Sequence, residues 1–72
     1  MKYIVKLCSI DEILYEETFH VDNQTFSYIG RIITNSLFPI EVKVERKYLL
    51  KHGVEILTTV VYYLCRSDYE KE

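Results

Sequence analysis

The sequence predicts a small single α+β domain, residues 1–72, in which one helix packs on one face of a four-stranded antiparallel sheet. Two pairs of segments are rich in β-branched and aromatic residues or alternate apolar with polar side chains, as strands do. One segment between these pairs repeats apolar residues every three or four positions, as a helix does. Because such a helix must bury its apolar side against a sheet, the expected element order is β-β-α-β-β.

The first hairpin is expected at residues 3–8 and 13–21. Residues 3–8 are mainly β-branched and aromatic, which is typical of a strand. Residues 13–21 alternate, but Glu17 interrupts the apolar side, which indicates an edge strand or a bulge. Carboxylates gather on this segment, which we call the acidic hairpin. They are Asp11, Glu12, Glu16, Glu17 and Asp22.

The helix is expected at residues 23–36. Asp22 and Asn23 are of the types that cap helix N-termini, and Pro39 ends the segment because the residue before a proline is pushed out of the helical conformation. We expect Gly30 to let the helix approach the sheet closely. The apolar positions at helical spacing are Phe26, Ile29, Ile32, Ile33 and Leu37. The partners expected for this stripe are Val5, Val44 and residues 54–66.

The second hairpin is expected at residues 41–50 and 54–66. Gly53 provides the turn between them, because glycine adopts positive φ at little cost. A helical turn at residues 46–51 is the competing local structure. Residues 67–72 are expected to form a frayed polar tail.

Residues 54–66 carry apolar or aromatic side chains on both faces. One row is Ile56, Val60, Tyr62 and Leu64, and the other is Leu57, Val61, Tyr63 and Cys65. One helix covers only one face of a sheet, so the second row would form an exposed apolar patch. We therefore expect a homodimer centred on this strand, formed by stacking two faces or by joining two strands edge to edge.

Composition and charge exclude several classes of protein. The net charge of −2 lacks the basic excess of a dedicated nucleic-acid binder. Residues 56–65, the longest uncharged apolar run, are too few for a helix that spans a bilayer. Lys6 lies where a signal peptide needs its apolar core, and two cysteines do not make a disulfide scaffold. We expect a cytoplasmic protein, in the host cytoplasm if a phage encodes it, and no contact with membranes.

Metal binding and catalysis find little support in the sequence. Zinc could in principle be bound by Cys8, His20, His52 and Cys65, but no pair has the close spacing of a zinc knuckle. A Cys8–Cys65 disulfide would require neighbouring strands. Cys8 with His20 is the one pairing of nucleophile and base that a hairpin could bring together, and no phosphate-binding or hydrolase motif occurs. We expect no metal, cofactor or small-molecule substrate, and no enzymatic activity.

The expected function is protein–protein interaction by a non-catalytic inhibitor or adaptor, of the kind that phages and mobile elements use against a host macromolecule. The chain contains seven tyrosines, a residue type enriched at interfaces. A row of carboxylates can also imitate phosphates and occupy a basic groove. The expected protein-binding residues are Glu12, Tyr15, Glu16, Glu17, Leu57, Val61 and Tyr63.

The alternative function is nucleic-acid binding by a small regulatory module. Cationic side chains cluster on the second hairpin and could contact phosphates. Glu41 and Glu45 interleave with them, which weakens the local positive potential. The expected contacts for this alternative are Lys43, Arg46, Lys47 and Lys51.

Overall fold

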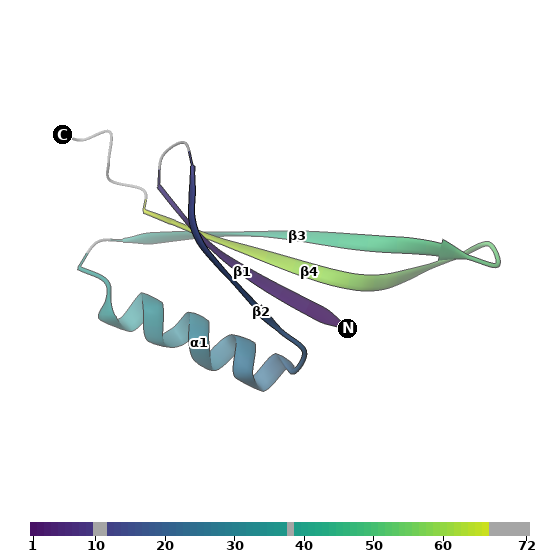
Figure 1. The fold of residues 1–72 in the computed structure, drawn as a ribbon, viewed down its shortest axis with the longest axis horizontal. Helices are drawn as coiled ribbons and strands as arrows, with labels where there is room; N and C mark the ends of the chain where they lie inside the picture. The colour runs from purple at the N-terminus through teal and green to yellow at the C-terminus, as the bar shows by residue number, and fades with distance from the viewer. Residues whose placement is uncertain (10–11, 38, 67–72) are drawn as a thin grey trace.

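The computed structural model describes residues 1–9, 12–37 and 39–66. Its element order is β-β-α-β-β, as predicted, with each bound within two residues of expectation (Figure 1). The elements are β1 (Lys2–Cys8), β2 (Ile13–Phe19), α1 (Asp22–Asn35), β3 (Ile40–Lys51) and β4 (Val54–Arg66). Residues 46–51 belong to β3, so the competing helical turn is excluded. The predicted tail lies outside the described residues.

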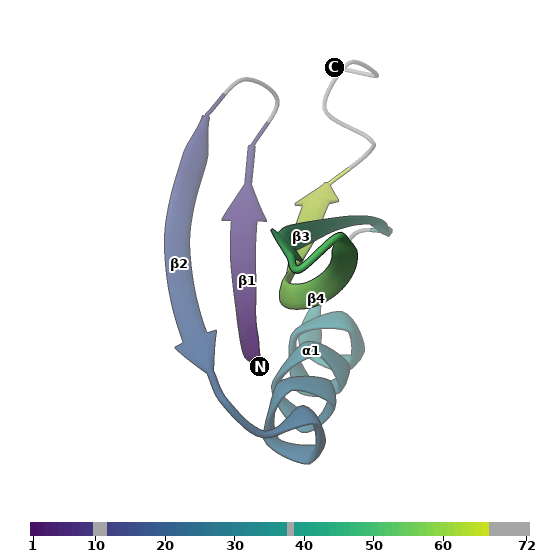
Figure 2. The same ribbon diagram turned by 90° about the vertical axis from the view of Figure 1, so that its right-hand side faces the viewer.

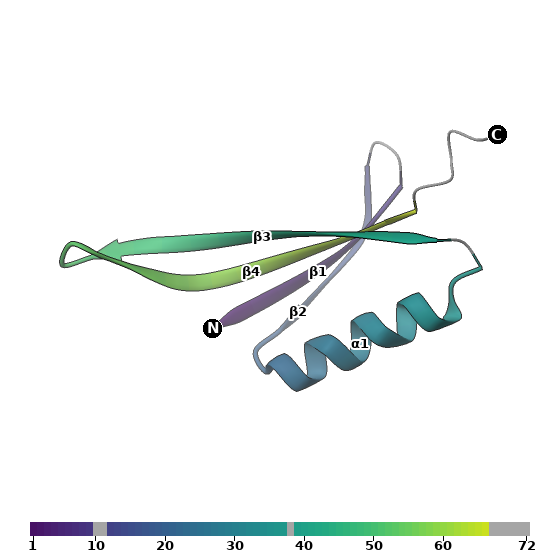
Figure 3. The same ribbon diagram turned by 180° about the vertical axis from the view of Figure 1, so that it is seen from behind.

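The sheet is mixed, and the prediction of a purely antiparallel sheet was wrong. Its strand order is β2-β1-β4-β3, in which both hairpins are antiparallel but β1 and β4 run parallel at the centre. The reason lies in the connection from β2 to β3. The helix α1 has 14 residues, about 21 Å, and carries the chain back from the end of β2 toward the start of β3 (Figure 1). The chain therefore enters β3 at the far edge in the direction of β2, which brings β1 and β4 side by side in parallel (Figures 1 and 3).

The core lies between α1 and one face of the sheet, which we call the helix-bearing face. The ring centroids of Phe26 and Tyr62 are 6.0 Å apart, which identifies the face to which Tyr62 belongs. Strand alternation and register then assign the other members of this face. On β1 and β4 they are Tyr3, Val5, Leu7, Val60, Tyr62 and Leu64. Val5, Val60 and Leu64 are buried, and the opposite face is called the open face.

The buried side of α1 is rotated from the predicted stripe. Thr25 is fully buried, and its hydroxyl donates a hydrogen bond of 3.0 Å to the carbonyl of Val21. Such a bond satisfies a buried threonine, which is why a polar residue can face the core. In the predicted stripe Ile29 is half-buried, whereas Phe26 and Ile33 are exposed and Leu37 is 92% exposed. The predicted stripe is therefore only partly buried.

Gly30 does not have the packing role that we expected. It is exposed, and a Cβ atom built at this position has no heavy atom within 4 Å. The prediction of close helix–sheet approach at Gly30 was wrong because this position belongs to the solvent side of the rotated helix.

The β3–β4 hairpin extends beyond the rest of the sheet. β1 pairs only with residues 59–65 of β4, so residues 48–57 continue as a two-stranded projection that we call the arm. Figure 1 shows that the arm extends beyond both β1 and α1, and Figure 2 gives a view along the arm. The molecule measures 50 × 24 × 15 Å. At its tip His52 and Gly53 have φ of 53° and 79°, the positive values of a tight two-residue turn.

A β-bulge at Thr58 marks the base of the arm. Lys47 pairs with Thr59 and Tyr48 with Leu57, which leaves Thr58 as an extra residue in β4. One extra residue exchanges the two faces of a strand. The two predicted rows of β4 therefore hold for residues 60–65, whereas Leu57 changes to the Tyr62 row and Ile56 to the Tyr63 row.

Candidate protein-binding site

The open face is a network of charged and aromatic side chains rather than an apolar patch. Tyr63 lies at its centre, between Lys6 of β1 and Lys43 of β3 in register. The Tyr63 hydroxyl donates a hydrogen bond of 2.9 Å to Glu45, and the Lys6 amine lies 5.4 Å from the centroid of the Tyr63 ring. The hydrogen bond to Glu45, followed by burial, raises the pKa of Tyr63. The Glu45 carboxylate and the Lys6 amine therefore both hold the Tyr63 ring in place.

These contacts cover the second apolar row of β4. Val61 is 1% exposed, and Tyr63 and Cys65 are half-buried. The structure favours neither of the two dimer contacts that we expected on β4, the stacking of two faces and the edge-to-edge joining of two strands. The row offers little apolar surface for stacking, and residues 59–65 already pair with strands on both sides. The homodimer itself stays a prediction that needs another surface.

The acidic residues of the first hairpin do not form one surface. Glu16 lies on the open face opposite Lys6, whereas Tyr15 and Glu17 lie on the helix-bearing side of β2. The Tyr15 hydroxyl donates a hydrogen bond of 2.7 Å to Glu17, which is the main cause of the raised pKa of Tyr15. Glu12 is exposed before β2. These four residues lie at the opposite edge of the sheet from Leu57, which belongs to the arm.

The basic residues divide in a similar way. Lys43 and Lys47 lie on the open face, alternating with glutamates, while Arg46 lies on the helix-bearing side and Lys51 near the tip of the arm. Register brings Lys2 and Lys6 of β1 onto the same face as Lys43 and Lys47. The sequence alone did not predict that these two pairs of lysines share a face, because this depends on the pairing of β1 with β4.

Cys8 and Cys65 are register partners on the parallel central strands, and both are free thiols. Burial and then the neighbouring Cys65 thiol raise the pKa of Cys8 from 9.0 to about 11. His20 follows the far end of β2, and His52 lies at the tip of the arm, so the four candidate zinc ligands are dispersed. Among the residues described, no three His, Cys, Asp or Glu side chains come together as a metal-binding group.

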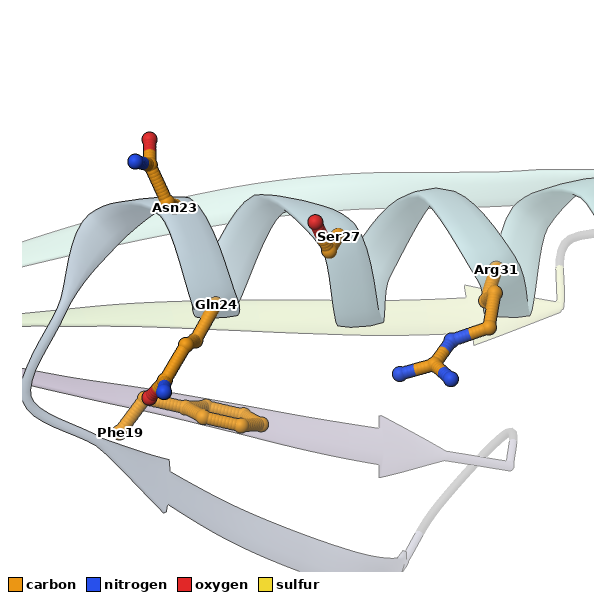
Figure 4. Close-up of a pocket in the computed structure, with 5 residues that line it drawn as sticks. All are labelled: Phe19, Asn23, Gln24, Ser27 and Arg31. Atoms are coloured by element: carbon orange, nitrogen blue, oxygen red, sulfur yellow. The ribbon is translucent and has the colours of Figure 1, made fainter.

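An open hollow lies on the surface of the helix. It has a volume of about 460 Å³ beside α1, where Gln24 and Arg31 extend from the helix toward Phe19 (Figure 4). Its remaining lining residues are Asn23 and Ser27. It contains one cation and no pair of nucleophile and base, so it has no arrangement for acid–base or covalent chemistry.

The arm carries five exposed large apolar side chains, three on β3 and two on β4. Their exposed fractions lie between 44% and 69%. They are Tyr48, Leu49, Leu50, Val54 and Ile56. The sequence did not predict the exposure of these side chains, because the periodicity of a strand does not show whether other elements cover its side chains. The usable signal was length, since β3 and β4 have 12 and 13 residues but β1 has seven.

Comparison with known proteins gives no relative for this chain: no family model, curated protein or solved structure matches it. In the part of the chain that the structure describes, no helix has the length and hydrophobicity needed to cross a membrane.

Proposed function

We propose that this chain is a non-catalytic protein-binding module whose principal contact is the arm. The observation that supports this most directly is the exposure of five large apolar side chains on a projecting hairpin. An isolated two-stranded hairpin is marginally stable in water. Burying the exposed half of each side chain against a partner would contribute about 1 kcal/mol per residue. Binding would therefore stabilise the arm as well as the complex.

The arm carries apolar side chains on both of its faces. Tyr48, Leu50 and Leu57 lie on one face, and Leu49 and Ile56 lie on the other. A partner groove that encloses the hairpin would bury both faces, whereas a flat surface would bury one. Stoichiometric occupation of such a groove is the action of an inhibitor or an adaptor, and a host macromolecule is the partner that we propose.

The test uses two exposed leucines that differ in their position. Leu50 is 69% exposed on the arm, and Leu14 is 59% exposed on the first hairpin. Immobilised wild-type, Leu50→Ser and Leu14→Ser chains would be used to capture proteins from host lysate, followed by mass spectrometry and affinity measurement. We expect Leu50→Ser to weaken binding of the captured protein about tenfold, the equivalent of ~1.4 kcal/mol. Equal loss with Leu14→Ser, or no loss with Leu50→Ser, would reject the arm as the contact.

Nucleic-acid binding is the second candidate, supported by Lys2, Lys6, Lys43 and Lys47 on the open face. Under this alternative, a single-stranded oligonucleotide would be shifted in a gel at low salt and released at higher salt. Combined Lys43→Glu and Lys47→Glu substitutions would abolish the shift, and Leu50→Ser would leave it unchanged. The opposite sensitivities of the two variants separate the two functions.

A further inference from the structure

The outer edge of β3 is a long strand edge without a neighbour. Among the described residues β3 pairs with β4 alone, and every residue from Glu41 to Lys51 is exposed. α1 lies on one side of the sheet and does not lie over this edge (Figure 2). An edge of this length presents a row of unpaired N–H and C=O groups that can pair with another strand.

The charges along this edge are complementary to themselves. On the open face β3 carries Glu41, Lys43, Glu45 and Lys47, in alternating sign. If two copies pair antiparallel about a two-fold axis at Val44, Glu41 of one copy faces Lys47 of the other. Lys43 likewise faces Glu45. The symmetry repeats both contacts, so four opposite-charge pairs form and none of like charge.

Neighbouring registers lack this property. An axis at Lys43 places Lys43 against its own copy and Glu41 against Glu45. An axis at Glu45 places Glu45 against itself and Lys43 against Lys47. Two more distant registers are also unfavourable. An axis at Arg46 places two arginines opposite each other, and an axis at Val42 leaves only residues 40–44 paired.

The same register aligns apolar side chains on the helix-bearing face. Val44 meets Val44 at the axis, and Tyr48 meets Ile40. Val44 and Tyr48 are exposed in the single chain. The arm would then continue past the start of the other copy's β3. One register therefore satisfies the charges of one face and covers apolar groups on the other.

We propose that two copies of this chain pair through β3 about a two-fold axis at Val44, which joins their sheets into one of eight strands. The paired segment spans residues 40–48 of each copy, about 30 Å of edge. Residues 49–57 of both arms lie beyond it, so the dimer presents this part of the arm twice. This proposal does not depend on the arm binding another protein.

The test exchanges charges without changing the net charge. In Lys43→Glu with Glu45→Lys, the two pairs between positions 43 and 45 reverse their polarity and the two pairs between Glu41 and Lys47 are unchanged, so the dimer is retained. In Glu41→Lys with Lys43→Glu, all four pairs become like-charged. Sedimentation velocity from 1 to 100 µM should give about 17 kDa, twice 8.6 kDa, for the wild type and the first variant. The second variant should dissociate with a Kd about 10- to 100-fold higher at low salt.

The first variant also controls for damage to the fold. It removes the Glu45 carboxylate to which Tyr63 donates, whereas the second variant keeps this bond. A loss of dimer caused by misfolding would therefore appear in the first variant rather than the second, and far-ultraviolet circular dichroism checks both. A wild type of 8.6 kDa throughout the range, or equal dimerisation of both variants, would overturn the proposal.

Discussion

Replacing each of the two glycines by alanine should change stability in opposite directions. Gly30 lies in the interior of α1, is exposed, and would gain a methyl group that meets no heavy atom within 4 Å. Alanine is favoured over glycine in a helix by about 0.8–1.0 kcal/mol. We therefore expect Gly30→Ala to raise the free energy of unfolding by about 1 kcal/mol, which corresponds to roughly 4–8 °C in Tm for a domain of this size.

Gly53 is the matched control because its added methyl group would also meet no heavy atom within 4 Å. It differs in conformation, with φ of +79°. A residue with a Cβ atom pays about 1–2 kcal/mol in the left-handed region, so Gly53→Ala should be destabilising by that amount. The two variants thus receive the same atoms in equally open surroundings, and only the backbone conformation decides the sign.

Thermal and urea unfolding followed by circular dichroism would measure both variants. Each experiment needs two protein concentrations, because a dimer makes Tm depend on concentration. A lower Tm for Gly30→Ala would refute the reasoning, since it would mean that the exposed side of α1 is covered in solution. A neutral Gly53→Ala would mean that the turn of the arm opens without unfolding the core.

Three further changes test local features of the fold. His52 has φ of 53°, so His52→Asn should raise Tm by a few degrees, because asparagine tolerates this conformation better. Thr25→Val should lower the free energy of unfolding by about 1 kcal/mol in urea titrations, because it removes the buried hydrogen bond to Val21. Alkylation of Cys8 should reach half of its maximal rate near pH 11 rather than near pH 9, as its raised pKa requires. Since the folded state favours the protonated Cys8 thiol, its contribution to stability should be complete below pH 9 and lost between pH 9 and 11.

Local pattern was sufficient to predict the elements but not their arrangement. The bounds of β4 and the turn at Gly53 follow from residue type and alternation within a few positions. The strand order depends on which strands meet at the centre, and residues 3 and 60 are too far apart in the chain for periodicity to relate them. Hydrophobic spacing also misplaced the buried side of α1, because it does not count a threonine such as Thr25, which bonds to its own backbone.

The surroundings of Tyr63 and the exposure of the arm could not be predicted from the sequence, because they also depend on how the strands are arranged. Tyr63 lies on the face opposite Tyr62, as strand alternation predicts, yet the charged groups that contact it come from β1 and β3 and were not foreseen. The bulge at Thr58 left no trace in the sequence, because β4 is apolar on both sides and an exchange of faces preserves that pattern. Exposure of the arm depends on the length of β1, which is a property of another segment.

The parallel contact between β1 and β4 has a consequence for how the chain folds. Tyr3 and Val60 are partners across 57 positions, so closing this loop costs about 3.6 kcal/mol of chain entropy before the contact contributes. Each antiparallel hairpin forms locally within microseconds, and their joining is then the slow step. At a synthesis rate of about 5–20 residues per second, β1 waits roughly 3–11 s on the ribosome for its partner in β4. During that interval Val5, which is fully buried in the folded protein, lacks the neighbouring side chains of β4 that share its face.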